Sequence, residues 1–212
     1  MATGITIASA AAKNVVPCVL ELGGKSAAIV HSDADLEAME IDIRKGIFIN
    51  AGQVCSAMSR IIVHESRHDE LVQRAVSIAE SLSVGPGLDR QTFGANMGPM
   101  VSVKQRDRAA GLVSEAVSQG AKLATGGRAM NIPGAFLQPT VLTEVTPEMT
   151  IAQTEVFGPV LSVLRFREDS EAIEIANGTD YGLVGGVFTR DLDRATQVAR
   201  KIRAGQVLSL IH

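Results

Sequence analysis

The feature that most constrains the fold is a regular alternation of β-rich runs and helical segments in the second half of the chain. Val160–Phe166, Leu183–Thr189 and Gln206–Ile211 have strand character, whereas Asp169–Ala176 and Leu192–Ile202 have helical spacing. Such alternation is typical of α/β proteins, in which helices connect parallel strands. We therefore expect a layered, mostly parallel sheet with helices on both faces and short antiparallel additions.

The first half of the chain continues the pattern. The remaining elements that periodicity predicts are helices at residues 4–13, 36–47, 69–82 and 101–120, and strands at 15–22, 60–64, 121–127 and 135–145. Residues 83–100 are rich in Gly and Pro, which predicts a long loop. Ser32–Asp35 resembles a helix N-cap, so the helix that follows should deliver Asn50–Cys55 at its C-terminal exit.

Composition excludes several classes of partner. The 212 residues are 46% hydrophobic and 20% charged, with a formal net charge of −3. Because Lys and Arg form no basic block and no apolar run reaches the roughly 20 residues of a spanning helix, we expect neither a nucleic-acid nor a membrane partner. Two cysteines are too few for a disulfide framework, and no leader is visible, which predicts a cytoplasmic location. A small molecule is the expected partner.

The first candidate site residue is Glu21, in the motif LELGGKS. We interpret Val15–Leu22 as a buried strand, where a carboxylate must be hydrogen-bonded or functional because burying it unpaired is expensive. The Gly23-Gly24 pair that follows allows a backbone to come close. Glu21 is thus expected to be functional, with a satisfied core glutamate as the alternative.

The second candidate is Cys55, within FINAGQVCSAMSR. A free cysteine is usually a small buried hydrophobe, and we interpret Cys18 in that way. Cys55 differs because turn-forming residues surround it and keep its sulfur off a packed face. These residues are Asn50, Gly52 and Gln53. Backbone N–H groups in such a turn could hold a thiolate or an oxyanion.

The third motif is TEVFGPV, where Glu155 and Phe157 flank a valine before a Gly-Pro turn. A lone phenylalanine is more often core than a cofactor contact, and a lone glutamate is more often on the surface. The presence of the other two motifs in the same chain is what makes this pair a candidate.

Together these motifs resemble the aldehyde dehydrogenase superfamily in type, order and spacing. The cysteine follows the glutamate of ELGGKS by 34 residues (55 − 21 = 34), and EVFGPV comes later. The resemblance continues through NMGPMVSVKQ, GAKLATGG, FLQPTVL and NGTDYGLVGGVFTRDLDRA, and it covers essentially the whole chain. Ala27 stands where the family's glutamate signature most often has Pro.

The resemblance implies a catalytic pair. Cys55 is similar to the nucleophile that adds to an aldehyde carbonyl, giving a thiohemiacetal and then, after hydride transfer, a thioester. Glu21 is similar to the general base that activates water for thioester hydrolysis. No metal is implied, and none of the four histidines lies in a motif, which weakens the case for a Cys-His hydrolase.

The resemblance also implies an NAD or NADP site. Glu155 is similar to the glutamate that holds the nicotinamide-ribose hydroxyls, and Phe157 to the aromatic residue that packs near that end of the cofactor. Gln105 and Arg108 fall where the family often has a Gln and a Lys near the same ribose, although Arg108 departs from Lys. We expect Glu21 and Cys55 to line one cleft, with Glu155 and Phe157 across the opening.

The domain organisation follows from the same resemblance. Residues 1–22 look like the last helix and strand of a cofactor-binding domain, and residues 23–212 like a catalytic domain truncated at its C-terminus. An oxyanion-hole asparagine would then be absent, and losing one such donor costs roughly 10²–10³ in rate, so we expect the chain alone to be inactive as a dehydrogenase. The apolar face formed by Ile5, Ile7 and Ala11 should be exposed or mobile. The full-length parent is expected to be a homo-oligomer.

Two other functions stay open at this point. One is a non-catalytic relative that keeps the fold as a scaffold, and the other is a cysteine-dependent esterase. A scaffold needs neither Cys55 nor Glu21, so their joint presence favours the enzyme. These motifs specify neither the aldehyde nor the choice between NAD and NADP.

Overall fold

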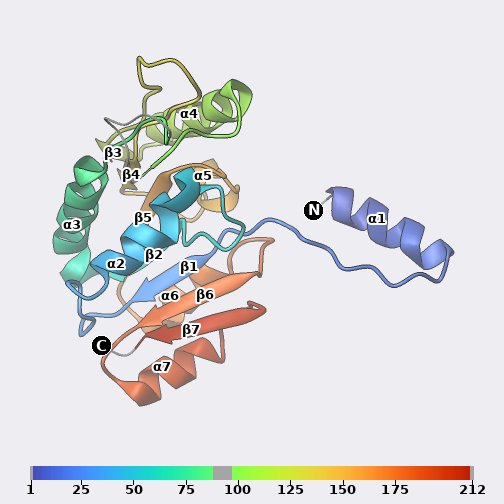
Figure 1. Ribbon diagram of the computed structural model, residues 1–212. Helices are drawn as coiled ribbons and strands as arrows, with labels where there is room; N and C mark the ends of the chain where they lie inside the picture. The colour runs from blue at the N-terminus through green and yellow to red at the C-terminus, as the bar shows by residue number, and fades with distance from the viewer. Residues whose placement is uncertain (1, 88–96, 211–212) are drawn as a thin grey trace.

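The computed structural model describes residues 2–87 and 97–210, whose strands form one seven-stranded sheet in the order β3-β4-β5-β2-β1-β6-β7 (Figure 1). The strands are β1 (Ala27–Val30), β2 (Arg60–His64), β3 (Lys122–Thr125), β4 (Thr140–Thr143), β5 (Val160–Phe166), β6 (Val184–Phe188) and β7 (Gln206–Leu210). Only β3 runs antiparallel to its neighbour; the other adjacent pairs are parallel. The predicted α/β class, with a mostly parallel sheet and a short antiparallel addition, is confirmed.

Helix α1 precedes the first strand, and the other helices lie in the connections between strands. The helices are α1 (Ala2–Lys13), α2 (Glu40–Ile43), α3 (His68–Ser81), α4 (Val103–Ser118), α5 (Thr150–Gln153), α6 (Asp169–Asn177) and α7 (Leu192–Ala199). The start of α4 is set by Ser102, whose hydroxyl oxygen accepts from the Gln105 N–H at 3.2 Å. Asp191 caps α7 in the same way through the Arg194 N–H at 3.0 Å.

Alternate residues of the central strands supply two hydrophobic cores. On β1, Ala28 and Val30 pack with the α2 and α3 side of the sheet. Ala27 and Ile29 face the other side, which α4, α5, α6 and α7 cover. This two-residue period follows from strand geometry and explains why each face needs its own layer of helices. The prediction of helices on both faces is confirmed.

The predicted strand at residues 15–22 is wrong. This segment is irregular, and the side chains of Val15 and Val19 are 91% and 89% exposed. A strand is stable only where a neighbour takes up its backbone hydrogen bonds, and no described strand pairs with this segment. The first strand is β1 instead. Cys18 lies in the irregular segment and is exposed, so its interpretation as a buried hydrophobe is also wrong.

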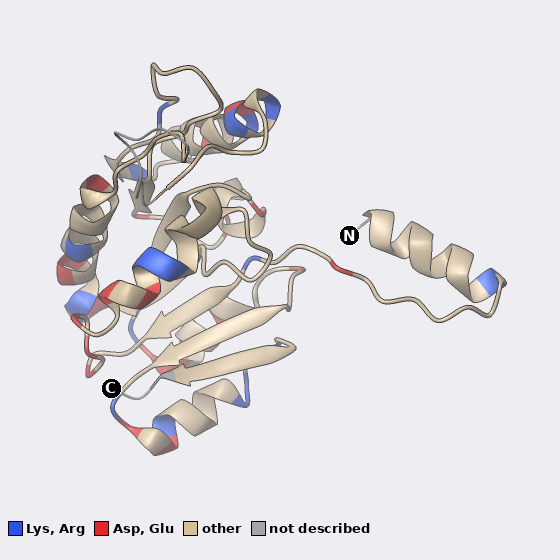
Figure 2. Cartoon of the chain, in the orientation of Figure 1, with Lys and Arg blue, Asp and Glu red and all other residues tan. Residues whose placement is uncertain are grey.

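Helix α1 stands apart from the sheet (Figure 1), and its only charged side chain is Lys13 at its C-terminal end (Figure 2). Ile5 and Ile7 are 66% and 48% exposed, as expected, whereas Ala11 is half-buried. The side chain of Leu22 folds back onto Gly4, the one buried residue of the helix. Within the described residues, no helix is both long enough and apolar enough to span a membrane.

The helix predicted at residues 36–47 is shorter than expected. After turns that Asp35 caps through the N–H groups of Glu37 and Ala38, α2 covers four residues. A π-helical turn and a 3₁₀ turn then carry the chain to residue 52. The predicted loop at 83–100 falls partly outside the described residues, and a bridge between Val84 and Met97 joins its described ends.

Candidate functional site

The three motifs meet at one edge of the sheet. Parallel strands begin at the same edge, and each motif directly precedes a strand: Leu20–Ser26 precedes β1, Asn50–Cys55 lies before β2, and Thr154–Pro159 precedes β5. We call this the amino edge. The sheet therefore assembles segments that lie about 30 and 100 residues apart in the sequence.

A left-handed turn leads to Cys55. Asn50, Ala51 and Gly52 have φ values of 51°, 53° and 71°, a region that costs non-glycine residues about 1–3 kcal/mol each. The Asn50 side-chain amide donates to the Gln53 carbonyl at 3.0 Å, and the Gln53 amide donates back to the Asn50 carbonyl at 2.9 Å. The expected turn chemistry is present, and reciprocal hydrogen bonds stabilise it.

Because Gly52 has no side chain, this turn can pack closely against the third motif. A Cβ at Gly52 would lie 2.0 Å from the carbonyl oxygen of Gly158, which no side chain tolerates. Phe157, next to Gly158, is itself left-handed with φ 52°. The turn before the thiol and the Glu155–Gly158 loop thus fix each other's backbone positions.

Cys55 lies in a turn closed by the Ala57 N–H, which donates to the Val54 carbonyl at 3.0 Å. Its side chain is half-buried, so it is not packed in a core. A Cβ at Gly24 would come within 2.4 Å of the Cys55 carbonyl oxygen, so the first motif touches the thiol-bearing turn through a glycine. The flanking residues Val54 and Ser56 line an open cavity of about 250 Å³.

Glu21 is exposed and belongs to no strand, which corrects the expectation of a buried carboxylate. Because its oxygens face solvent, it needs no compensating partner. Glu21 and Glu155 both line an open cavity of about 380 Å³, together with Tyr181. The structure therefore brings the two glutamates into one cavity, whereas Cys55 and Phe157 are not among the residues that line it.

Glu155 approaches the first motif closely. Its Oε1 accepts from the Gly24 N–H at 3.1 Å, and a Cβ at Gly23 would lie 2.0 Å from its Oε2. The expected close approach of a backbone is observed at Gly24, where the Cys55 carbonyl comes near, whereas the group that comes near Gly23 is the Glu155 side chain. The ring of Phe157 is 37% exposed beside it.

Gln105 and Arg108, on the first turns of α4, hold the backbone of the Glu155–Gly158 loop. The Gln105 amide donates to the carbonyls of Val156 and Phe157 at 2.9 and 3.1 Å. Arg108 donates to the carbonyls of Val156 and Glu155, both at 3.0 Å. Both side chains therefore act on the candidate site through the position of this loop.

Sequence reasoning missed two buried cations at the amino edge. Lys25 and Arg60 are each 2% exposed. Burial, with the neighbouring Arg60 charge adding to it, lowers the pKa of Lys25 from 10.5 to about 7, and burial lowers the pKa of Arg60 to about 10. A signal was present, because Lys25 lies between a Gly-Gly pair and the apolar run Ala27–Val30, where a lysine cannot easily reach water.

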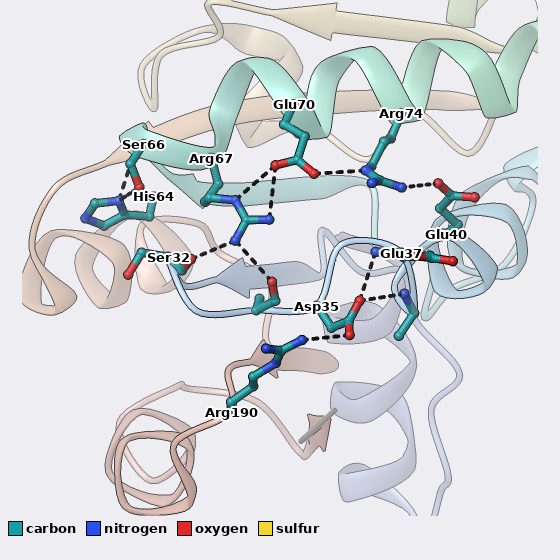
Figure 3. A network of polar contacts seen from close by, with 12 residues as sticks. Ser32, Asp35, Glu37, Glu40, His64, Ser66, Arg67, Glu70, Arg74 and Arg190 are labelled. Atoms are coloured by element: carbon teal, nitrogen blue, oxygen red, sulfur yellow. Dashed lines mark hydrogen bonds and ion pairs between the residues drawn. The ribbon is translucent and has the colours of Figure 1, made fainter.

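The opposite, carboxyl edge of the sheet carries a paired network (Figure 3). Arg67 donates to the Ser32 carbonyl at 2.8 Å and to the Glu70 carboxylate at 3.1 and 3.2 Å. The Asp35 carboxylate accepts from the Arg190 guanidinium at 2.9 Å. The backbone N–H of Ala38 and then Arg190 hold the pKa of Asp35 below its usual value.

Comparisons of the sequence and of the structure with known proteins find the same family. The sequence model of the aldehyde dehydrogenase family matches residues 1–209. The mitochondrial aldehyde dehydrogenase of Leishmania tarentolae is 44% identical over 93% of this chain and 39% of its own length. A solved variant of the Bacillus cereus aldehyde dehydrogenase has a TM-score of 0.93 at 40% identity, covering 98% of this chain and 42% of that one.

A further solved relative contains a cofactor. The betaine aldehyde dehydrogenase from Staphylococcus aureus, solved in complex with NAD⁺, has a TM-score of 0.91 at 38% identity, covering 99% of this chain and 42% of that one. This chain thus spans about two fifths of the length of the relatives that it matches.

Proposed function

The chain belongs to the aldehyde dehydrogenase family, and from that membership we propose that it carries the catalytic residues of an NAD(P)-dependent enzyme that oxidises an aldehyde to a carboxylic acid. The observation that supports this most is the contact between Gly24 and the Cys55 carbonyl. It joins the segment that carries the candidate base, Glu21, to the turn that carries the candidate thiol.

Cys55 is the proposed nucleophile. Its thiolate sulfur forms a bond to the aldehyde carbon, and the carbonyl oxygen becomes an oxyanion. When bound, the nicotinamide ring supplies the acceptor for the hydride that leaves this carbon. The acyl group stays on Cys55 as a thioester until water releases the carboxylic acid. A half-buried thiol at the end of a strained, hydrogen-bonded turn suits a group that must be both accessible and fixed.

Glu21 is the proposed general base for that water. Its carboxylate is solvent-exposed and lines the 380 Å³ cavity, so water can reach it directly. A carboxylate that takes a proton from water in the deacylation step needs this access, whereas a buried, fully hydrogen-bonded glutamate would not have it.

Glu155, which lines the 380 Å³ cavity, and Phe157, two residues further along the chain, fit the nicotinamide-ribose part of NAD or NADP. Glu155 has one oxygen on the Gly24 N–H and a second oxygen to offer to sugar hydroxyls, and the partly exposed Phe157 ring offers an apolar surface next to it. We propose Glu155 as the ribose ligand and Phe157 as the packing surface. Gln105 and Arg108 would support them by holding the loop, and direct contact of either with the ribose stays a prediction.

We further propose that residues 1–22 belong with a cofactor-binding domain and residues 23–212 with the catalytic domain. The separation of α1 from the sheet supports this division (Figure 1). For the substrate, the cavity lined by Val54 and Ser56 is the proposed site for the remainder of the aldehyde, because the residues on both sides of Cys55 in the chain line it. A cytoplasmic location and a homo-oligomeric parent stay predictions.

The test uses a chimera in which this chain replaces the matching segment of the Bacillus cereus relative, assayed with aldehyde and NAD in single turnovers. Cys55→Ala should abolish NADH formation and ester hydrolysis together, because no covalent intermediate can form. The control Cys18→Ala, which changes the exposed cysteine, should keep both activities. NADH production by Cys55→Ala would refute the mechanism.

The two glutamates separate the steps in the same chimera. Glu21→Gln should give a burst of NADH followed by a stalled acyl-enzyme, and normal turnover would show that Glu21 is not the base. Glu155→Gln should slow NADH formation but spare ester hydrolysis, since its proposed partner is the cofactor. Ester hydrolysis that depends on Cys55 without NADH formation would favour the esterase, and no activity of either kind would favour the scaffold.

A further inference from the structure

Arg60, the first residue of β2, is a buried charged side chain that has no role in the proposed reaction. It is 2% exposed and follows Cys55 by five residues (60 − 55 = 5). Burying a guanidinium costs much of its hydration free energy, and a well-packed apolar side chain in its place is often as stable. Packing alone therefore does not account for an arginine at this position.

The Arg60 guanidinium joins two elements through three hydrogen bonds. Its Nε donates to the Lys25 carbonyl, just before β1, at 3.0 Å. Its two terminal nitrogens donate to the carbonyls of Ile175 and Ala176, in the last turn of α6, at 2.9 Å each. Carbonyls at the end of a helix have no partner within the helix and suit a cation. The planar guanidinium reaches all three carbonyls at once, a geometry that an ammonium does not reproduce.

The C-terminal end of α6 is also held by contacts that do not involve Arg60. The Asn177 side-chain amide donates to the Lys201 carbonyl at 2.9 Å, and its oxygen accepts from the Arg203 N–H at 2.7 Å. These bonds join α6 to the segment that leads to β7. The end of α6 is thus a stable support, to which Arg60 attaches the segment before β1.

The segment that Arg60 holds carries the glycine that contacts the turn of the candidate thiol. The Arg60 backbone N–H donates to the Ser26 carbonyl at 3.2 Å, so backbone and side chain both bind this segment. Two residues earlier, Gly24 packs against the Cys55 carbonyl. The Gly24 N–H also donates to the Glu155 carboxylate at 3.1 Å. The position of Gly24 therefore affects both the thiol-bearing turn and the third motif.

We propose that Arg60 is a positioning residue for the reaction of Cys55. It holds the segment before β1 where Gly24 packs against the Cys55 carbonyl, and as the first residue of β2 it also fixes the chain that leaves the Cys55 turn. The inference rests on the proposed function, in which Cys55 is the nucleophile. Arg60 acts through the backbone, and a displacement of about 1 Å between reacting groups costs on the order of 10² in rate.

The first test measures amide hydrogen exchange by NMR in the 212-residue chain and needs no enzyme activity. Arg60→Lys keeps the charge but loses the planar donors. It should raise the exchange rates of the Gly24 and Ala57 amides by roughly tenfold, because their hydrogen bonds to Glu155 and Val54 depend on the held segment. Amides of α4 should change much less. No change at Gly24, or an equal change at every amide, would overturn the proposal.

The second test measures acylation of Cys55 by an ester in the chimera described above. Arg60→Lys should lower the acylation rate constant by roughly 10–100-fold and leave the KM for the ester nearly unchanged, because the thiol is displaced while the binding surfaces stay intact. Arg60→Met, which has no donors, should lower the rate constant further. A rise in KM at an unchanged rate constant would contradict a positioning role.

Asn177→Ala gives the same test without a substitution of the buried arginine. Asn177 is half-buried, and its loss releases the end of α6 from the Lys201 and Arg203 backbone. Acylation should slow by roughly three- to tenfold, less than in Arg60→Lys, because the guanidinium bonds remain. An unchanged rate constant in both variants would refute the positioning role.

Two controls separate positioning from stability. Leu71→Ala leaves a cavity in α3 on the other face of the sheet, so it destabilises the chain but should keep the acylation rate constant while the chain is folded. Arg165→Lys alters an exposed arginine of β5 that pairs with Glu144, and it should change neither readout. Equal slowing in Leu71→Ala and Arg60→Lys would show that stability alone is responsible and would overturn the proposal.

Failure of the positioning role and failure of the proposed function give different results. Full ester hydrolysis by Cys55→Ala refutes the nucleophile, whatever Arg60→Lys does. Loss of hydrolysis in Cys55→Ala together with normal acylation in Arg60→Lys refutes the positioning role alone.

Discussion

The two edges of the sheet differ in how their polar groups are satisfied. At the carboxyl edge, the charged side chains of the network pair with one another or with backbone groups, as Arg67 and Asp35 do (Figure 3). At the amino edge, the Lys25 ammonium has no partner among the described residues, Glu21 faces solvent, and consecutive residues are left-handed. The network at the carboxyl edge therefore has the features of a structural contact, whereas the amino edge has the features of a functional site.

The difference between the two edges indicates at which edge of the sheet the functional site lies. In open parallel sheets, ligands generally bind beyond the carboxyl ends of the strands. Here the candidate residues precede their strands, so the site lies at the other edge. Backbone strain and unmatched buried groups are often retained where function requires them. Three left-handed residues in a row occur at the amino edge, at Asn50, Ala51 and Gly52, whereas the carboxyl edge has single cases of each feature, at Glu144 and at His31 Nε2.

The largest effect on stability should come from the close contact that shapes the amino edge. Gly52→Ala forces a Cβ into the Gly158 carbonyl at positive φ and should destabilise the chain by about 3 kcal/mol or more. Gly111→Ala is the matched control, since α4 leaves open space there, and it should stabilise by about 0.5–1 kcal/mol. Urea unfolding measures both, and equal effects would show that the turn is not tightly held.

A smaller effect should come from the titration of Lys25. Its folded pKa of about 7 lies below the unfolded value, so between pH 7 and 10.5 the unfolded chain binds more protons, and stability rises with pH in that window. Below pH 7 both states are charged, and the full burial penalty applies.

The free energy of unfolding of the unsubstituted chain minus that of Lys25→Met should increase by about 2 kcal/mol from pH 7 to pH 9. Denaturant unfolding at each pH measures this difference. A difference that stays flat with pH would mean that Lys25 keeps its ordinary pKa in the folded chain.

The smallest effect is expected at the carboxyl edge. Arg67→Ala removes contacts to Glu70 and to two backbone carbonyls and should cost about 1 kcal/mol, while the chimera keeps its activity. Arg200→Ala, an exposed arginine of the α7 end, should change neither. Loss of activity in Arg67→Ala with stability intact would contradict the division between the two edges.

Much of the amino edge could be predicted because parallel strands start together. Once the alternation predicted a parallel sheet, motifs that directly precede strands had to converge, and the glycine pair at Gly23-Gly24 correctly indicated a close approach. The turn before Cys55 could also be predicted, since Asn and Gly favour turn conformations and the Asn and Gln side chains can hydrogen-bond to nearby backbone groups.

The errors have a common physical cause. The run at residues 15–22 has the composition of a strand, but a strand depends on a neighbour that no local pattern reveals, so Glu21 and Cys18 were placed in a core that does not exist there. The real first strand, Ala27–Val30, is only four residues long and escaped notice. The burial of Arg60 has the same cause, since its guanidinium donates to carbonyls of Lys25 and of α6 that only the folded chain brings near. Lys25 differs, because the apolar run after it is a local signal of burial.

The separation of α1 from the sheet has a consequence for proteolysis. Lys13 is exposed at the end of that helix, whereas Lys25, twelve residues further on (25 − 13 = 12), is buried where the sheet begins. A protease that cuts after lysine therefore meets an accessible bond on one side of the first motif and a protected one within it. Brief trypsin treatment should first release the helix as a peptide and leave a core that retains Glu21, Cys55 and Glu155.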